Sequence, residues 1–216
     1  MPLKGLIFDF DGLIVDTESA IIEAWQTIHR EDGRAAQPEI LFALIGHVDV
    51  VVDLWEAYPA GHDKAALELR HRALSRQFMA VAPVRPGIAA LFAEARTAGL
   101  RLAVASNSSH SHVERQLGAR GLLTFFDTIV CREDVVSGKP APDLYLAALA
   151  RLGLDAAQAL AFEDSVPGHV AAASAGLRVI VVPNPATAHH VFPAATRRWE
   201  SLQGIELAHL ELVMAG

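Results

Sequence analysis

The sequence has little of several residues that would point to particular classes of protein. Its 216 residues include one cysteine, Cys131, which cannot form an internal disulfide, so a disulfide-stapled secreted scaffold is excluded. Only three lysines are present (Lys4, Lys64 and Lys139), and 18 basic residues against 25 acidic ones give a net charge of −7. A nucleic-acid partner is therefore not expected, because nucleic-acid phosphates call for clustered basic side chains.

Long apolar stretches are also missing. No run approaches the roughly 20 residues that span a bilayer, so no membrane partner is expected. The N-terminus reaches Asp9 and Asp11 too soon for the apolar part of a signal peptide. We therefore expect a cytoplasmic protein. The hydrophobic share of 52% is too high for a disordered chain, and the length suits one generous domain or one domain with an insertion.

Short apolar runs alternate with segments of helical periodicity. The apolar runs are nearly continuous in hydrophobicity, which is typical of parallel strands buried on both faces. Strands are predicted at 5–10, 102–106, 128–131, 159–162 and 178–183. Helices are predicted at 88–97, from a capping box at Ser111 to about Gly118, at 144–152 and at 167–175, and 188–216 reads as a variable strand or loop and a final helix. This alternation predicts an α/β fold with a Rossmann-like parallel sheet.

One long segment breaks the alternation. Residues 17–82 show helical periodicity, at Ile21, Ile22, Trp25 and Ile28 and then at Leu67, Leu69, Leu74 and Phe78, and contain no convincing buried strand. An all-helical insertion after the first strand would lie over the carboxyl ends of the strands, where open α/β sheets bind ligands. The sequence therefore predicts a catalytic core at 1–16 and 83–216 and a helical cap at 17–82.

Two acidic pairs follow predicted strands. Asp9 and Asp11 end the first strand, with Gly12 allowing a sharp turn after them, and Glu163 and Asp164 follow the strand at 159–162. Carboxylates that converge at one sheet edge form a hard-oxygen site that suits Mg²⁺. Each pair also has a purely structural interpretation: the first as a polar strand end with an Asx turn, the second as a helix N-cap by Asp164 or Ser165.

Three further residues carry groups that can bind a phosphate. Ser106 and Asn107 end the second strand and can donate to phosphate oxygens, although a simple Ser/Asn turn is the better explanation when this segment is taken in isolation. Lys139 lies in Ser137-Gly138-Lys139-Pro140, where neighbouring Gly and Pro restrict the loop and would aim its ammonium at a fixed point. A solvated surface lysine is the alternative there.

Taken together, these motifs resemble the haloacid dehalogenase-like (HAD) superfamily. The motifs are Asp9-Phe10-Asp11-Gly12 continuing to Glu18, then Ser106, then Gly138-Lys139-Pro140, then Glu163-Asp164-Ser165, in order over residues 5 to about 183. They most resemble the phosphatase and β-phosphoglucomutase-like branch with a helical cap. Hydrolytic dehalogenases lack a second aspartate at the position of Asp11, so its presence favours phosphoryl transfer.

The resemblance implies a role for each matching residue. Asp9 would be the nucleophile that forms an aspartyl-phosphate, and Asp11 the general acid and then the base. The phosphoryl group would be held by Ser106, Lys139 and Asn107. Mg²⁺ would be bound by the Asp9 carboxylate, the Asp11 main-chain carbonyl and Asp164, with Glu163 acting indirectly or through water.

Departures from family patterns narrow the activity. The β-phosphoglucomutases carry a His where this chain has Ile21 and a cap Arg where it reads Gly46-His47-Val48-Asp49, so a cationic group for a second phosphate is missing. Phosphonatases use a cap lysine, and Lys64 lies in what reads as an exposed turn. We therefore expect an Mg²⁺-dependent phosphatase, a monomer or weak dimer, acting on a small phosphorylated metabolite such as a sugar phosphate or phosphoglycolate. The alternatives are a β-phosphoglucomutase-type isomerase and a non-catalytic binding module.

The ten histidines do not indicate zinc, because none has the helical spacing of a zinc motif backed by other ligands. His110 and His112 are interpreted as surface or packing residues, while His47 and His62 are weak candidates for substrate contact from the cap. Trp25 and Trp55 are expected in the core of the cap.

Overall fold

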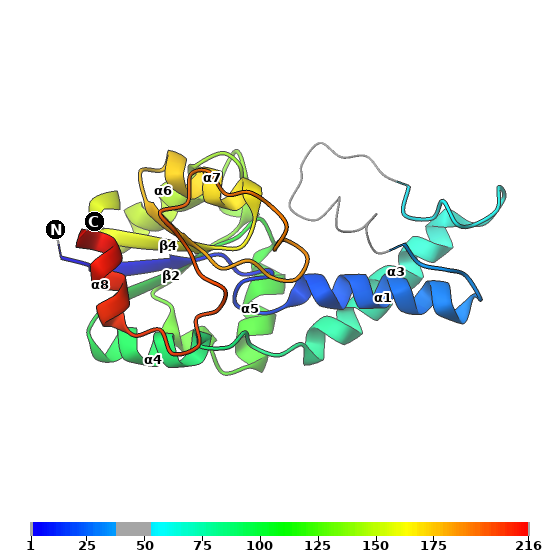
Figure 1. Ribbon diagram of the computed structural model, residues 1–216, viewed down its shortest axis with the longest axis horizontal. Helices are drawn as coiled ribbons and strands as arrows, with labels where there is room; N and C mark the ends of the chain where they lie inside the picture. Colours follow the sequence, from blue (N-terminus) through cyan, green and yellow to red (C-terminus); the bar gives the residue numbers. More distant parts are fainter. Residues whose placement is uncertain (1, 38–52, 216) are drawn as a thin grey trace.

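The computed structural model describes residues 2–37 and 53–215, whose centre is a parallel sheet (Figure 1). Within these residues the sheet has six strands in the order β3-β2-β1-β4-β5-β6, and every neighbouring pair is parallel. The strands are Gly5–Phe8 (β1), Arg101–Ala105 (β2), Thr128–Val130 (β3), Ala159–Glu163 (β4), Arg178–Val181 (β5) and Arg197–Arg198 (β6). The predicted α/β class with a Rossmann-like sheet is confirmed.

Helices cover both faces of this sheet. On one face lie α4 (Ile88–Thr97), α5 (His110–Ala119) and α8 (Leu207–Ala215), and on the other α6 (Asp143–Leu152) and α7 (Val166–Ser174) (Figure 1). The two faces follow from strand alternation, since Leu6 and Phe8 join the first core while Ile7 joins the second. Phe8 of β1 stacks on Phe162 of β4 with ring centroids 4.6 Å apart.

Several predicted boundaries needed correction. The strands β1 and β5 end at Phe8 and Val181, earlier than expected, because the apolar residues Phe10 and Val182 that follow are buried in loops rather than in the ladder. Ser111 does not cap α5. Ser109 has the extended backbone of an N-cap and its Oγ accepts from the amide of His112, so the helix begins at His110.

The helical segment consists of α1 (Thr17–Glu31) and α3 (Lys64–Val81), which pack against each other and extend away from the sheet (Figure 1). Trp25 and Trp55 are 1% and 2% exposed in its core, as predicted. Leu69, expected on the apolar side of the second helix, is 68% exposed, because it follows Leu67 by two positions and so faces away from it.

The chain passes between the sheet and the helical segment twice, and these two connections lie side by side. Val15 and Val84 form an antiparallel bridge there. The guanidinium of Arg85 donates to the carbonyl oxygens of Gly12 and Val182 at 2.8 Å and of Pro183 at 2.7 Å. This arrangement ties the turn after β1 to the loop after β5. No helix in the described ranges has both the length and the apolar character needed to cross a membrane.

Candidate active site

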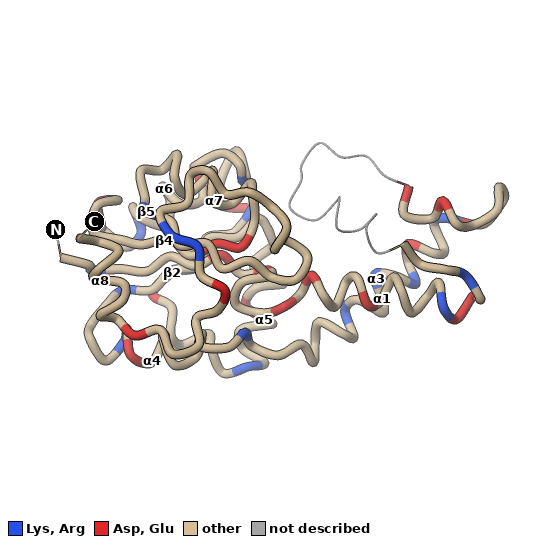
Figure 2. Tube along the Cα trace, viewed as in Figure 1, with Lys and Arg blue, Asp and Glu red and all other residues tan. Residues whose placement is uncertain are grey.

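The two acidic pairs meet because β1 and β4 are neighbours in register. Phe8 pairs with Phe162, and the amide of Asp9 donates to the Phe162 carbonyl at 3.0 Å. Carboxylate oxygens of Asp9, Glu163 and Asp164 lie within 4.8 Å of one another, and all three residues are buried. Figure 2 shows acidic residues along the border between the sheet and α1. Three of the four predicted carboxylates thus converge, while that of Asp11 points toward the start of α5.

Lys139 lies inside this acidic cluster rather than on the surface. Its ammonium, with the side chain 4% exposed, donates to Asp9 Oδ1 and, at 2.6 Å, to Glu163 Oε1. Burial disfavours the charged form, but Asp9 and Glu163 more than offset it and hold the pKa of Lys139 above its usual range. The interpretation of Lys139 as a solvated surface lysine is therefore wrong.

Glu163 is held on both oxygens by donors. Oε1 accepts from Lys139 and from the hydroxyl of Tyr145 at 2.6 Å, and Oε2 accepts from the amide of Asp164 at 3.0 Å and the hydroxyl of Ser165 at 3.1 Å. A Cβ on Gly168, in the first turn of α7, would lie 1.9 Å from Glu163 Oε1, so this position requires glycine. Burial would raise the pKa of Glu163, but Lys139 and these hydrogen bonds keep it below its usual value. Through this hydrogen bond the Glu163 carboxylate holds the ammonium of Lys139 in position.

Asp164 keeps one oxygen without a partner. Oδ2 accepts from the amide of Asn184 at 2.7 Å, while Oδ1 is buried with no hydrogen-bond partner among the described residues. Ser165, not Asp164, caps α7, through a hydrogen bond from Gly168 at 3.2 Å, so Asp164 is not engaged as a cap. Burial raises the pKa of Asp164 well above its usual value, and the nearby charges of Glu18 and Asp9 add to this. An orphaned oxygen in an all-carboxylate group fits a hard divalent cation.

The turn after Asp11 leaves no space for a side chain. Gly12 has φ +82°, and a Cβ there would come within 2.3 Å of Asp164 Oδ2 and 2.6 Å of Asn184 Nδ2. The same region contains Glu18, in the first turn of α1, which accepts from the amide of Asn184. Burial raises the pKa of Asp9 to about 7 and that of Glu18 to about 8.

Ser106 and Asn107 follow β2 beside this cluster. Ser106 is 1% exposed, and its Oγ accepts from the amide of Ser108 at 3.0 Å. The side-chain amide of Asn107 forms a two-way bridge to the backbone of Lys139: Oδ1 accepts at 2.8 Å and Nδ2 donates at 3.3 Å. Asn107 thereby holds the loop that carries Lys139, and Ser106 lines the cavity in front of Asp9.

Sequence and structure comparisons decide the family. A family model described as haloacid dehalogenase-like hydrolase matches residues 6–182. The chain belongs to the haloacid dehalogenase-like hydrolase family. Hexitol phosphatase B of Escherichia coli K12 is 33% identical over 190 residues, 85% of each chain. CbbY of Rhodobacter capsulatus is 32% identical over 211 residues, covering 92% of this chain and 93% of CbbY.

The solved structures agree with this family. CbbY from Rhodobacter sphaeroides in complex with phosphate superposes with a TM-score of 0.76 at 32% identity, covering 97% of this chain and 99% of CbbY. The expected phosphatase-type member of the haloacid dehalogenase-like family is thereby confirmed. The acidic cluster is compatible with the divalent metal that was expected.

Several residues around the site escaped the sequence interpretation, among them Asn184, Ser108 and His112. Asp11 Oδ2 accepts from Ser108 Oγ at 2.5 Å, and Asp11 Oδ1 lies 3.1 Å from Nε2 of His112. Burial would raise the pKa of Asp11, but its hydrogen bond to His112 and the charge of that ring lower it below the usual value. His112 packs against Phe10, as the packing interpretation allowed, but it also contacts Asp11, which that interpretation did not include. The missed signal is the N-cap: with Ser109 as cap, His112 falls in the first turn of a helix that starts beside Asp11.

A cavity of about 430 Å³ lies between the sheet and the helical segment, and five of the seven predicted site residues line it, all except Glu163 and Asp164. Residues from both parts line it: Asp9, Asp11, Ser106, Asn107, Ser108, His112, Lys139, Ser165 and Pro167 from the core side, and Thr17, Glu18, Ile21 and Met79 from α1 and α3. The site is therefore an open pocket, between the sheet and the helical segment, that a small molecule can enter.

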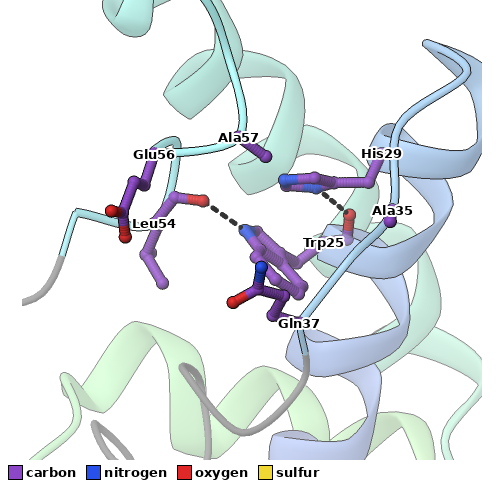
Figure 3. A pocket seen from close by; sticks show the side chains of 7 residues that line it. All are labelled: Trp25, His29, Ala35, Gln37, Leu54, Glu56 and Ala57. Atoms are coloured by element: carbon purple, nitrogen blue, oxygen red, sulfur yellow. Dashed lines mark hydrogen bonds between the residues drawn. The ribbon is translucent and has the colours of Figure 1, made fainter.

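A smaller cavity of about 180 Å³ lies within the helical segment (Figure 3). Trp25 Nε1 donates to the carbonyl of Leu54 and His29 Nδ1 contacts the carbonyl of Trp25, both at 2.9 Å. This cavity includes none of the carboxylates of the acidic cluster.

Other cap candidates lie apart from the site or outside the description. His62 packs against the ring of Tyr58 and does not line the larger cavity. Lys64 is exposed at the start of α3 and pairs with Asp53 at 2.5 Å. The motif that contains His47 falls outside the described residues.

Proposed function

We propose that this protein is an Mg²⁺-dependent phosphomonoester hydrolase that acts through an aspartyl-phosphate intermediate on a small phosphorylated metabolite. The observation that carries the proposal is that two aspartates only two positions apart have different hydrogen-bond partners. Asp9 lies with Lys139 in the buried acidic cluster, and Asp11 is held at the edge of the same cavity by Ser108 and His112. One carboxylate is placed to attack and the other to exchange protons with solvent or substrate.

The chemistry then follows in two steps. Asp11 must first take up a proton from solvent as the substrate binds. An oxygen of Asp9 then attacks phosphorus, the ester P–O bond breaks, and the protonated Asp11 gives that proton to the leaving alkoxide. A water molecule then loses a proton to Asp11 and attacks the phosphorus of the acyl phosphate, which releases inorganic phosphate and restores Asp9. Lys139, Ser106 and Asn107 stabilise the negative charge of the transferring phosphoryl group.

The metal proposal rests on the orphaned oxygen of Asp164. Asp9 and Asp164 would hold Mg²⁺ through their carboxylates, Asp11 through its main-chain carbonyl and Glu163 through water. When bound, Mg²⁺ offsets the repulsion between a phosphate dianion and the carboxylate nucleophile. The raised pKa values of Asp9 and Asp164 support this, since both carboxylates are buried beside other negative charges.

We assign residues 17–82 to a cap and residues 1–16 and 83–216 to the catalytic core. The cavity lined from both sides supports this division, and closure of the cap would exclude bulk water during the reaction. A monomer or weak dimer in the cytoplasm, with no nucleic-acid or membrane partner, stays our expectation.

A sugar or polyol phosphate is the substrate class we favour. The relative hexitol phosphatase B is named for such a compound, and CbbY from Rhodobacter sphaeroides has been crystallised with xylulose-(1,5)bisphosphate. From the cap side the described cavity is lined by apolar Ile21 and Met79 together with Thr17 and Glu18, and none of these four carries the positive charge that would suit a second phosphate. Phosphoglycolate remains in the test set because the cavity also accommodates a smaller acid.

The test is release of inorganic phosphate from a panel of hexitol phosphates, pentose and hexose phosphates and phosphoglycolate, with and without Mg²⁺. We expect turnover that requires Mg²⁺ and is abolished in Asp9→Asn but unchanged in Glu200→Gln, whose side chain is 87% exposed. Full activity of Asp9→Asn would rule the mechanism out. Conversion of β-glucose 1-phosphate to glucose 6-phosphate with little free phosphate would indicate a mutase instead.

A further inference from the structure

We propose that His112 is a positioning residue that fixes the carboxylate of Asp11 for proton transfer to the leaving oxygen. The inference rests on the proposed function, because it assigns a partner to the proposed general acid. A carboxylate can only accept hydrogen bonds, so Nε2 of His112 carries the hydrogen at the 3.1 Å contact with Asp11 Oδ1.

Asp11 is held at both of its oxygens by one segment of the core. Ser108 Oγ donates to Oδ2 at 2.5 Å and His112 donates to Oδ1; Ser108 lies in the turn from β2 into α5, and His112 lies in the first turn of α5. Two donors on opposite oxygens fix the rotation of the carboxylate plane as well as its position. Both of these donors come from the core, and the side chain of Thr17, the first residue of α1, adds a further hydrogen bond to Asp11.

The ring of His112 is itself held in place. Its backbone amide donates to Ser109 Oγ in the N-cap of α5, and the ring lies edge-on to Phe10 with centroids 5.7 Å apart. The side chain is 19% exposed and lines the larger cavity. His112 is therefore a held group on the wall of the site, and Nε2 of its ring is directed at Asp11.

A positioned acid matters only when the leaving group needs a proton. An alkoxide is a poor leaving group and requires one, whereas p-nitrophenolate is a stable anion and leaves without it. The kcat/KM reports phosphoryl capture by Asp9 and not the later hydrolysis of the intermediate. Loss of positioning at Asp11 should therefore lower kcat/KM for alkyl phosphates and leave it nearly unchanged for p-nitrophenyl phosphate.

The experiment compares His112→Ala, His112→Gln and His110→Ala on p-nitrophenyl phosphate and on the best alkyl phosphate of the panel. For His112→Ala we expect kcat/KM to fall about tenfold or more on the alkyl phosphate, since general acid catalysis contributes roughly 10²–10⁴-fold, and to change less than about twofold on the aryl ester. The side-chain amide of His112→Gln keeps an N–H donor and should restore most of the loss. The His110→Ala control should give wild-type values, because His110 instead contacts Glu114 on its own helix and Asp134 in the segment after β3.

An equal fall on both substrates, or no fall on either, would overturn the role of His112. The melting temperature of each variant shows whether an equal fall reflects loss of the fold. Failure of the wild-type protein to cleave either ester would instead overturn the proposed hydrolase function. The two failures are therefore distinct.

Discussion

The amide nitrogen of Asn184 donates to Asp164 Oδ2 at 2.7 Å and cannot turn away from it. The carbonyl oxygen of the same side chain accepts from the backbone amides of Ala186 at 2.8 Å and Thr187 at 3.2 Å, which fixes which end of the amide faces the acidic cluster. Asp164 is thereby oriented with Oδ1 directed away from Asn184 and without a partner in the described structure.

Asn184→Ala should weaken Mg²⁺ binding about tenfold or more, because partners that orient a metal ligand commonly contribute 10–100-fold to affinity. The measurement is calorimetric titration of Mg²⁺ into metal-free protein, which needs no substrate. Gln77→Ala, an exposed amide on α3, is the control and should bind as the wild type does. Unchanged affinity in Asn184→Ala would show that Asp164 does not depend on this contact.

Lys139→Met should remove activity and also stability. It leaves the buried carboxylates of Asp9 and Glu163 without their cation, and breaking a buried ion pair from one side costs about 3–5 kcal/mol. Urea unfolding of the metal-free protein measures the stability and phosphate release the activity. Lys4→Met, at an exposed position, should change neither. An active, fully stable Lys139→Met protein would contradict the assigned role.

The sequence alone predicted those site residues whose positions depend on where the strands end. Asp9 and Asp164 follow strands that the hydrophobic pattern reveals, and parallel neighbours bring such ends together without further information. The contact of His112 with Asp11 was missed because it depends on helix register: a cap at Ser111 would have started the helix two residues later. Asn184 had no signal of its own, since its orientation depends on a turn that only the backbone after β5 defines.

Glu18→Gln should change how stability depends on pH. Burial and the charges of Asp9 and Asp11 raise the pKa of Glu18 from 4.5 to about 8. The hydrogen bond from Asn184 acts in the opposite direction but does not offset them. The folded state therefore binds a proton that the unfolded chain has released. The resulting stabilisation is full below pH 4.5 and lost as the pH rises through 8.

The glutamine variant lacks this titration. With EDTA present, its melting temperature should match that of the wild type near pH 5 and exceed it by about 3 °C or more at pH 8.5, since 1 kcal/mol corresponds to about 2–4 °C at this size. Glu23→Gln, exposed on the same helix, should follow the wild type at both pH values. Parallel curves for Glu18→Gln and wild type would contradict the raised pKa.

Comparing Gly12→Ala with Gly121→Ala separates the effect of backbone strain from the effect of a steric clash with Asp164. Gly12 and Gly121 both have positive φ, at +82° and +68°, so alanine should cost about 1 kcal/mol in backbone strain at either position. Only at Gly12 would the new Cβ reach Asp164 Oδ2, at 2.3 Å, whereas at Gly121 it would meet nothing within 4 Å. We therefore expect similar backbone strain in the two variants but a loss of Mg²⁺ affinity and of phosphatase activity, about 100-fold, in Gly12→Ala alone.

The measurements are thermal melting, Mg²⁺ calorimetry and phosphate release on both proteins. Equal activity in the two variants would mean that Asp164 can move aside, and that the close approach of Gly12 does not fix the position of this carboxylate.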